Sequence, residues 1–208
     1  MNGTAHMVIG AGAGLLAAQY LQAAPADTLL LIGAGGISGL IPDLDVDGKL
    51  RNTFTSSHKF LMSLAQLIGI AVIIYSWWAG ADSEMWKGIS AGLAIMLVSV
   101  FIKKRHLLTV AGAGALAGGL FLDENWLWLF GIYIIIASLV SHRSYTHSLL
   151  GVAFFAIILH YLQISIATKG VLLAGAGGYI SHLIADMKFL PFNKRGVKLF
   201  LPFSKKDI

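Results

Sequence analysis

Long apolar runs separated by short polar segments fill almost the whole chain. Eight runs can be distinguished, at about residues 7–21, 28–41, 60–78, 86–102, 107–122, 126–140, 149–162 and 171–184. Continuous apolar runs of this length favour membrane-embedded helices. Several are shorter than the ~20 residues that a full crossing of the hydrocarbon core needs, so these helices are expected to tilt or to end inside the membrane. The pattern predicts an all-α, polytopic helical membrane protein with about eight transmembrane or partly re-entrant helices.

The composition supports this fold class. Of the 208 residues, 57% are apolar and only 12% are charged, whereas a soluble domain usually carries about 25% charged residues. The chain has no cysteine, which excludes disulfides, thiolate metal ligands and thiol nucleophiles. We expect one membrane-embedded helical domain over residues 1–208. Its basic C-terminal tail, residues 188–208, is expected to lie on an anionic leaflet, and a loosely ordered tail is the alternative.

The basic residues are distributed unevenly between the predicted loops. With eight spans, thirteen of the fifteen Lys and Arg residues fall on one side of the membrane, and only Lys87 and Lys169 fall on the other. Loops rich in Lys and Arg face the cytoplasm. We therefore expect a multi-pass cell-membrane protein with both termini cytoplasmic. The net charge of +5 then reports topology, and no nucleic-acid partner is expected.

Histidines and aspartates recur at the predicted cytoplasmic ends of these helices. They are His6, Asp43, Asp45, His142, His147, His182 and Asp186. Ligands that are distant in sequence but lie at one level of a helical bundle are what a bundle-borne metal site requires. Burying such groups unpaired near a bilayer is costly. His182 and Asp186 are four residues apart, so they lie on one face of a helix and suit two ligands to one metal.

Two carboxylates, Asp43 and Asp45, follow the second apolar run. Pro42 disfavours helix at Ile41 and is expected to end the run there. If the backbone is extended beyond Pro42, the two carboxylates point the same way and need a cation or a shared proton. The alternative is a solvated turn that ends the helix.

The stretch from His142 to Ser148 joins the sixth and seventh runs. His142 and His147 are five residues apart and would diverge on a regular helix, so His142 is expected to precede the helix start. Thr146 or Ser148 could cap that helix, and the Arg143 guanidinium matches the geometry of a phosphate. The alternative is an ordinary basic loop that sets topology.

Glycine-rich runs at residues 10–14 and 33–36 superficially suggest a dinucleotide-binding fingerprint. That fingerprint requires a preceding strand in a βαβ unit, which the pattern does not predict. We interpret these glycines as positions where helix backbones approach closely.

Together, these motifs resemble the YdjM-like family of predicted inner-membrane metal-dependent hydrolases. The matching segments are Thr4-x-His6, Leu40-Ile41-Pro42-Asp43-Leu44-Asp45, His142-Arg143-x-x-Thr146-His147-Ser148, Gly178-Tyr179-x-Ser181-His182-Leu183-x-x-Asp186 and Gly196-Val197-x-Leu199-Phe200-x-Pro202-Phe203. The family is distantly similar to zinc-dependent phospholipase C and P1 nuclease, which hydrolyse phosphate esters. The resemblance implies metal ligation by His6, Asp43, His142, His147, His182 and Asp186, with Asp45 as a further candidate.

We therefore expect a metal-dependent hydrolase that acts at the cytoplasmic face on a phospholipid or another lipid phosphoester through a metal-activated water. Asp43, Asp45 and Asp186 would bridge metals or orient the water, and Arg143 would bind an anionic group. Nitrogen and oxygen ligands suit zinc first, with manganese or iron as alternatives. The expected partners are membrane lipids, with an anionic phospholipid as substrate. A non-enzymatic metal- or proton-binding transporter or accessory protein is the alternative.

Overall fold

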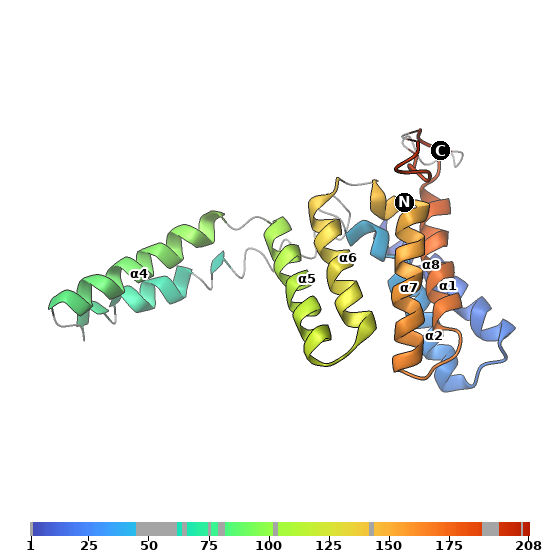
Figure 1. Cartoon of the computed structure of the whole chain (residues 1–208), viewed down its shortest axis with the longest axis horizontal. Helices are drawn as coiled ribbons and strands as arrows, with labels where there is room; N and C mark the ends of the chain where they lie inside the picture. Colours follow the sequence, from blue (N-terminus) through green and yellow to red (C-terminus); the bar gives the residue numbers. More distant parts are fainter. Residues whose placement is uncertain are drawn as a thin grey trace. The chain divides into compact units, whose positions relative to one another are not determined.

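The computed structural model describes residues 2–44, 62–63, 66–74, 76–78, 82–101, 104–141, 144–188, 196–204 and 206–208. All regular structure in these residues is helical, with no strand, so the all-α prediction is confirmed. Figure 1 shows the helices, which in chain order are α1 (Gly3–Tyr20), α2 (Pro25–Ser38), the 3-10 helix η1 (Ile41–Leu44), α4 (Asp82–Phe101), α5 (Lys104–Phe121), α6 (Asn125–Leu139), the 3-10 helix η2 (Tyr145–His147), α7 (Leu149–Ser165) and α8 (Val171–Asp186).

Contacts within the chain divide it into two compact units. The first unit consists of Met1–Arg51 and Leu108–Ile208, and the second consists of Asn52–Leu107. The second unit is therefore inserted into the sequence of the first. The prediction of one domain over residues 1–208 stays a prediction.

In the first unit, α1, α2 and α8 pack against one another along glycines. Gly10 of α1 and Gly178 of α8 both face the backbone of Gly35 in α2, and a Cβ atom added at any of the three would collide with a carbonyl oxygen. Only residues without a side chain allow backbones this close. The prediction of helix-packing glycines is confirmed here. It is wrong for Gly12 and Gly33, where an added Cβ would meet nothing within 4 Å.

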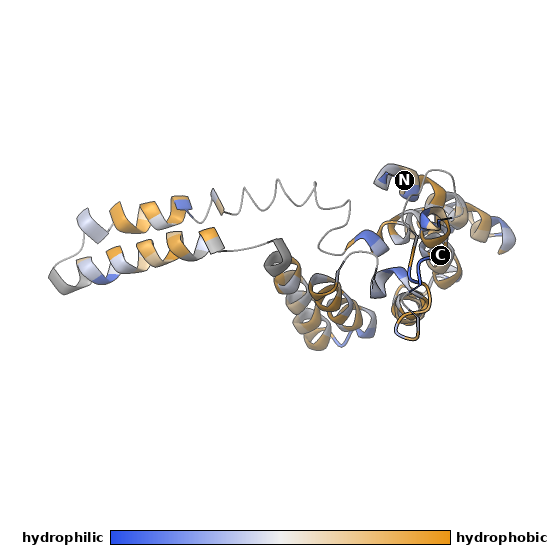
Figure 2. Cartoon of the chain, turned by 90° about the horizontal axis from the view of Figure 1, so that it is seen from above, coloured by the Kyte–Doolittle hydropathy of each residue, from blue (hydrophilic) through white to orange (hydrophobic). Residues whose placement is uncertain are grey.

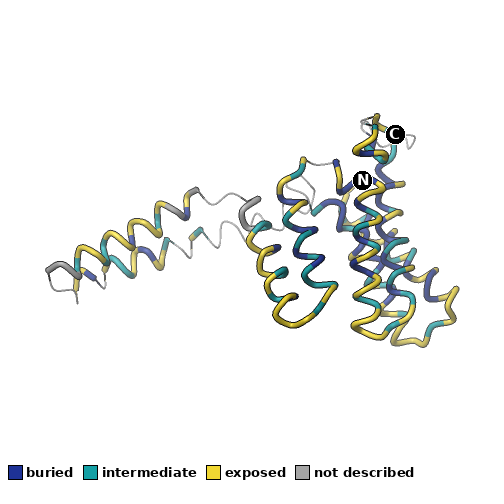
Figure 3. Tube along the Cα trace, viewed as in Figure 1, coloured by how far each residue is buried: buried dark blue, intermediate teal, exposed yellow. Residues whose placement is uncertain are grey.

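The helices α6 and α7 complete the core of this unit. Tyr133 of α6, Phe155 of α7 and Tyr179 of α8 are buried together, and the rings of Phe155 and Tyr179 lie 5.2 Å apart. Figure 3 shows buried residues running along α6, α7 and α8. The helix α5 packs along α6 where Gly112 meets Gly131. The polar residues described below are therefore supported by an apolar helical core.

Two short 3-10 helices position the polar segments. The helix α2 ends at Ser38, and η1 follows with Asp43 N donating to Leu40 O at 3.1 Å. This i to i+3 hydrogen bond places Asp43 in a tight turn. The backbone at Asp43 is therefore not extended, which was the condition for Asp43 and Asp45 to point the same way, and Asp45 lies outside the described residues. The Oγ of Ser148 accepts a hydrogen bond from Gly151 N at 3.3 Å, which confirms the predicted cap of α7.

The described part of the C-terminal tail folds back on the first unit. Ile208 O accepts hydrogen bonds from the N–H groups of Val197 and Lys188, at 3.1 and 3.0 Å, and Ile208 N donates to Val197 O at 3.0 Å. Leu199 O accepts from Leu149 N, the first residue of α7, at 2.9 Å. Val197 and Leu201 are buried. These residues are therefore packed, and the placement of the tail on an anionic leaflet stays a prediction.

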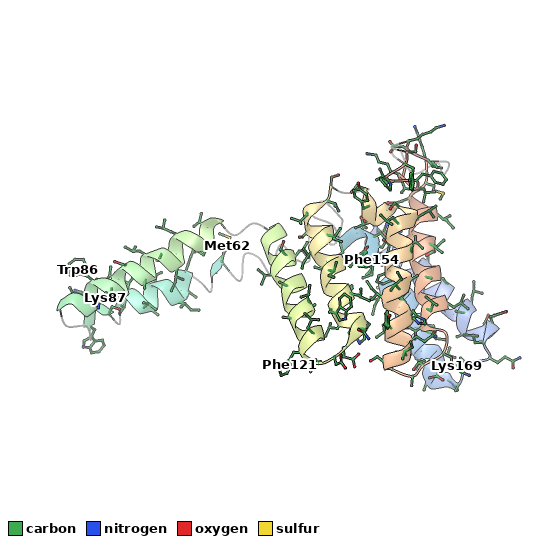
Figure 4. The ribbon with its side chains drawn as sticks, in the orientation of Figure 1. Met62, Trp86, Lys87, Phe121, Phe154 and Lys169 are labelled. Carbon is green, nitrogen blue, oxygen red and sulfur yellow. The ribbon has the colours of Figure 1, made fainter. Side chains whose placement is uncertain are left out.

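In the second unit, α4 packs against the helical residues 66–74. An added Cβ on Gly92 would lie 2.6 Å from Gly69 O, so glycines again set the helix spacing. Trp77, Trp78 and Trp86 are exposed, and Figure 4 labels Trp86 beside Lys87 in α4.

Large apolar side chains are exposed on helices of both units. Figure 2 colours the chain by hydropathy and shows hydrophobic residues in the helices of both units. Within the ranges described above, no helix combines the length and the hydropathy that a membrane crossing requires. The expected set of about eight membrane-crossing segments stays a prediction.

Candidate metal centre

Five ionisable side chains from four elements meet inside the first unit. They are His6 of α1, Asp43 of η1, His147 of η2, and His182 and Asp186 of α8. The three histidines are 0% exposed, and the two aspartates are 2–3% exposed. Burying so many ionisable groups in one place is unfavourable unless they are paired, hydrogen-bonded or bound to a metal. The cluster is therefore the principal candidate for a functional site.

The Nε2 atom of His182 lies at the middle of the cluster. It is 3.3 Å from His147 Nε2, 3.7 Å from Asp43 Oδ1 and 3.9 Å from Asp186 Oδ2. His147 Nε2 is also 3.7 Å from Asp43 Oδ1, and His6 Nε2 is 3.3 Å from Asp186 Oδ1. The His6 and His182 rings stack with their centroids 3.9 Å apart. The ring nitrogens and carboxylate oxygens thus face a common volume.

Hydrogen bonds on the opposite side of two rings fix their orientation. His182 Nδ1 lies 2.7 Å from the carbonyl oxygen of Gly39, which can only accept, so Nδ1 carries a proton. In the neutral ring, Nε2 then presents its lone pair to the cluster. His147 Nδ1 is hydrogen-bonded to Thr146 Oγ1 at 3.1 Å. Metal-ligating histidines are commonly held in this way through their other nitrogen.

The donor set fits a divalent cation. Two overlapping triads, His6, Asp43 and His182, and His147, His182 and Asp186, each offer ligand atoms within 4.8 Å of one another. Neither ring nitrogen of the buried His6 has a hydrogen-bond partner among the described residues. A cation between the imidazoles and the carboxylates would bind one of these two nitrogens and neutralise the acidic charge. The five side chains are therefore positioned to hold a metal ion.

A family model described as YdjM inner membrane protein matches residues 1–208. The chain belongs to this family. The predicted membership of the YdjM family is therefore confirmed, and the family description supports the predicted membrane localisation. The similarity of the family to phosphoester hydrolases stays a prediction. No curated protein and no solved structure matches the chain.

The structure brings together five of the sequence-predicted site residues of this YdjM-family protein: His6, Asp43, His147, His182 and Asp186. His182 and Asp186 are four residues apart on α8, and both side chains reach the cluster from one face of the helix, as this spacing predicted. The remaining candidates, Asp45, His142 and Arg143, lie outside the described residues. The roles assigned to all eight residues as ligands or catalytic groups stay predictions.

Sequence reasoning missed two groups that support this centre in the YdjM-family chain. The Tyr179 hydroxyl donates to Thr146 O and lies 2.9 Å from the Tyr133 hydroxyl. Tyr179 precedes His182 by about one turn of α8, so both side chains lie on the same face of the helix. A tyrosine hydroxyl on that face needs a hydrogen-bond partner when it is buried, and this could have identified Tyr179 from the sequence. The carbonyl of Gly39 gave no such signal, because every residue has one.

Proposed function

We propose that this YdjM-family protein is a membrane-bound, metal-dependent hydrolase that acts at the cytoplasmic face on a phospholipid or another lipid phosphoester. The observation that carries the proposal is the buried cluster of three imidazoles and two carboxylates. The family supports a location in the inner membrane. The uneven distribution of Lys and Arg supports a multi-pass topology with both termini and the site cytoplasmic.

The metal would be held by His6, Asp43, His147, His182 and Asp186. Nitrogen and oxygen donors without sulfur favour zinc, and manganese or iron are compatible with the same set. A bound divalent cation would supply Lewis-acid chemistry and activate water at neutral pH, which is what phosphoester hydrolysis requires.

The two described carboxylates have separate imidazole partners. Asp186 approaches His6 and His182, whereas Asp43 approaches His147 and His182. We assign them to orient the attacking water and to accept its proton, in a site that is nearly closed to solvent. Asp45 and Arg143 keep their proposed roles, as a further carboxylate and as the contact for an anionic headgroup.

The position of the cluster along the helices supports a lipid substrate. His182 and Asp186 occupy the last turns of α8, and His6 occupies the first turn of α1. In a membrane-embedded bundle, helix ends lie at the level of lipid headgroups, where the phosphoester bonds of phospholipids are found. A site at this level can reach a phosphoester without extracting the lipid.

The test combines metal analysis with lipid turnover by protein purified in detergent. We expect the wild-type protein to carry stoichiometric metal and to hydrolyse phospholipid in mixed micelles. His182→Ala and the near-isosteric Asp43→Asn should lose both properties, while His160→Ala, at an exposed histidine of α7, should keep them. Wild-type protein that binds no metal in any tested condition would overturn the proposal.

The second candidate is a non-enzymatic metal- or proton-binding transporter or accessory protein. The complete burial of the three histidines favours it, because an ion site that transfers its cargo needs no room for a lipid headgroup. Metal uptake into proteoliposomes without any lipid turnover would establish this alternative in place of the hydrolase.

A further inference from the structure

An apolar cavity of about 370 Å³ lies between α6 and α7, beside η2. The α6 wall includes Ile132 and Ile136, and the α7 wall includes Leu150 and Phe154. Figure 4 labels Phe154 on α7, and its ring stacks on that of Tyr133 in α6 at 6.0 Å. The volume falls within the range of small-molecule sites, about 300–1,000 Å³. The aliphatic and aromatic walls offer a ligand contact area but few hydrogen bonds.

One end of the cavity adjoins the candidate metal centre. Thr146 lines the cavity, and its Oγ1 is hydrogen-bonded to His147 Nδ1 at 3.1 Å. On the other side of that ring, His147 Nε2 lies 3.3 Å from His182 Nε2. Neighbouring residues of η2 therefore line the cavity and belong to the candidate metal centre.

The shared wall is held in place from α6 and α8. Tyr133, which also lines the cavity, is hydrogen-bonded through its hydroxyl to Tyr179, and Tyr179 donates to Thr146 O. Gly151 allows η2 and Tyr179 to pack closely against the start of α7, because an added Cβ would lie 2.5 Å from Tyr145 O and 2.8 Å from the Tyr179 hydroxyl. The cavity is thus a built feature of the fold at the contact between η2 and α7.

The other side of the cavity meets the protein surface. Ile136 and Leu150 line it and are 44% and 52% exposed. In a protein of an inner-membrane family, lipid is the apolar molecule available at such a surface. A flexible hydrocarbon chain can fill an elongated apolar site without any polar group to orient it.

We propose that this cavity binds one acyl chain of a membrane phospholipid whose headgroup lies at the metal centre. The inference rests on the proposed function and deepens it, since the cavity would select the substrate by its acyl chain. Ile136 and Leu150 would then determine specificity, because they form the entrance. Both positions tolerate larger side chains, since each is half exposed.

The test uses photoreactive phospholipid with a diazirine in the acyl chain, incorporated into nanodiscs with the full chain. After irradiation, mapping of the labelled peptides should place the label on residues 132–136 and 150–154. Leu150→Trp and Ile136→Trp should reduce this label several-fold and leave metal content and melting temperature unchanged. The matched control is Ile157→Trp, which lies on α7 like Leu150, is 48% exposed and does not line the cavity.

A second arm compares turnover of long-chain phospholipid with turnover of a water-soluble short-chain phosphoester. The Trp variants should lose long-chain turnover selectively. If the Trp variants turn over long-chain phospholipid as fast as the wild type, the proposed acyl-chain site is wrong. The same holds if the peptide that contains Ile157 is labelled as strongly as the cavity residues. Neither result would contradict the proposed hydrolase activity. Specific labelling without turnover of either substrate would instead overturn the hydrolase and retain the acyl-chain site.

Discussion

The Nδ1 atom of His182 lies 2.7 Å from the carbonyl oxygen of Gly39, a residue 143 positions earlier in the chain. This contact joins the end of α2 to the ligand-bearing turn of α8. It also determines which nitrogen of His182 faces the other imidazoles. The backbone at Gly39 therefore supports the candidate metal centre, although it contributes no side chain.

Gly39→Ala is expected to weaken metal binding. An added Cβ would lie 2.6 Å from His6 O, so α1 and the α2 end must separate, and His6 and the Gly39 carbonyl must shift. Changes behind a metal ligand typically cost about 10–100-fold in affinity. Competition with a chromogenic chelator would measure the change.

The control for that experiment is Gly33→Ala in the same helix. An added Cβ there meets nothing within 4 Å, so the substitution should stabilise α2 by about 0.5–1 kcal/mol through helix propensity. Equal metal affinities in the two variants would contradict the role given to Gly39.

Tyr179→Phe is expected to destabilise the protein by about 1–3 kcal/mol, because it removes a buried hydrogen bond to Thr146 O. It should also reduce metal affinity, since Thr146 positions His147. Thermal melting in detergent, with and without added zinc, would measure both effects. Tyr161→Phe, at an exposed position of α7, should change neither.

The two tyrosines should be energetically coupled, because their hydroxyls lie 2.9 Å apart. Tyr133→Phe combined with Tyr179→Phe should cost less than the sum of the two single changes. Additive losses would show that Tyr133 does not support the metal centre through Tyr179.

Removal of the metal should lower the melting temperature. A ligand that binds only the folded state stabilises it by about 2.7 kcal/mol at 100 times its dissociation constant. Addition of excess chelator should remove that stabilisation, and zinc should restore it. A melting temperature that is indifferent to both additions would argue against a metal in this cluster.

Metal occupancy should decrease as the pH is lowered. Protons compete with metal ions for the imidazole nitrogens, so binding releases protons and is weakened by acid. Titration of zinc at several pH values would check the direction. The variant Asp43→Asn should bind weakly at every pH, whereas Asp27→Asn, at an exposed carboxylate in the first turn of α2, should behave like the wild type.

Much of the candidate site could be predicted because its chemistry is carried by side chains. Imidazoles and carboxylates are rare in this apolar chain, and their repeated positions at helix ends indicated that they converge. The spacing of four between His182 and Asp186 was sufficient to place both on one face. The close approach of Gly10, Gly35 and Gly178 also followed from the absence of a side chain.

Other features had no equivalent signal in the sequence. The turn that contains Asp43 depends on a backbone hydrogen bond to Leu40 O, and the orientation of His182 depends on the Gly39 carbonyl. The apolar cavity arises from the spacing of α6 and α7 around η2, which no local pattern determines. The fold-back of the tail through Val197 and Ile208 is likewise a main-chain interaction between distant residues.

The candidate ligands are spread along the sequence from His6 to Asp186. The helix α7, which follows η2, also depends on a later part of the chain, because its first residue, Leu149, donates its N–H to Leu199 O. During synthesis, a nascent chain that already carries His6 and Asp43 still lacks both ligands of α8. Both triads of imidazole and carboxylate donors among the described residues include His182 of α8. A metal held by either triad would therefore be bound only after α8 has been synthesised, and a ribosome-bound intermediate without α8 would present separate ligands instead of a finished centre.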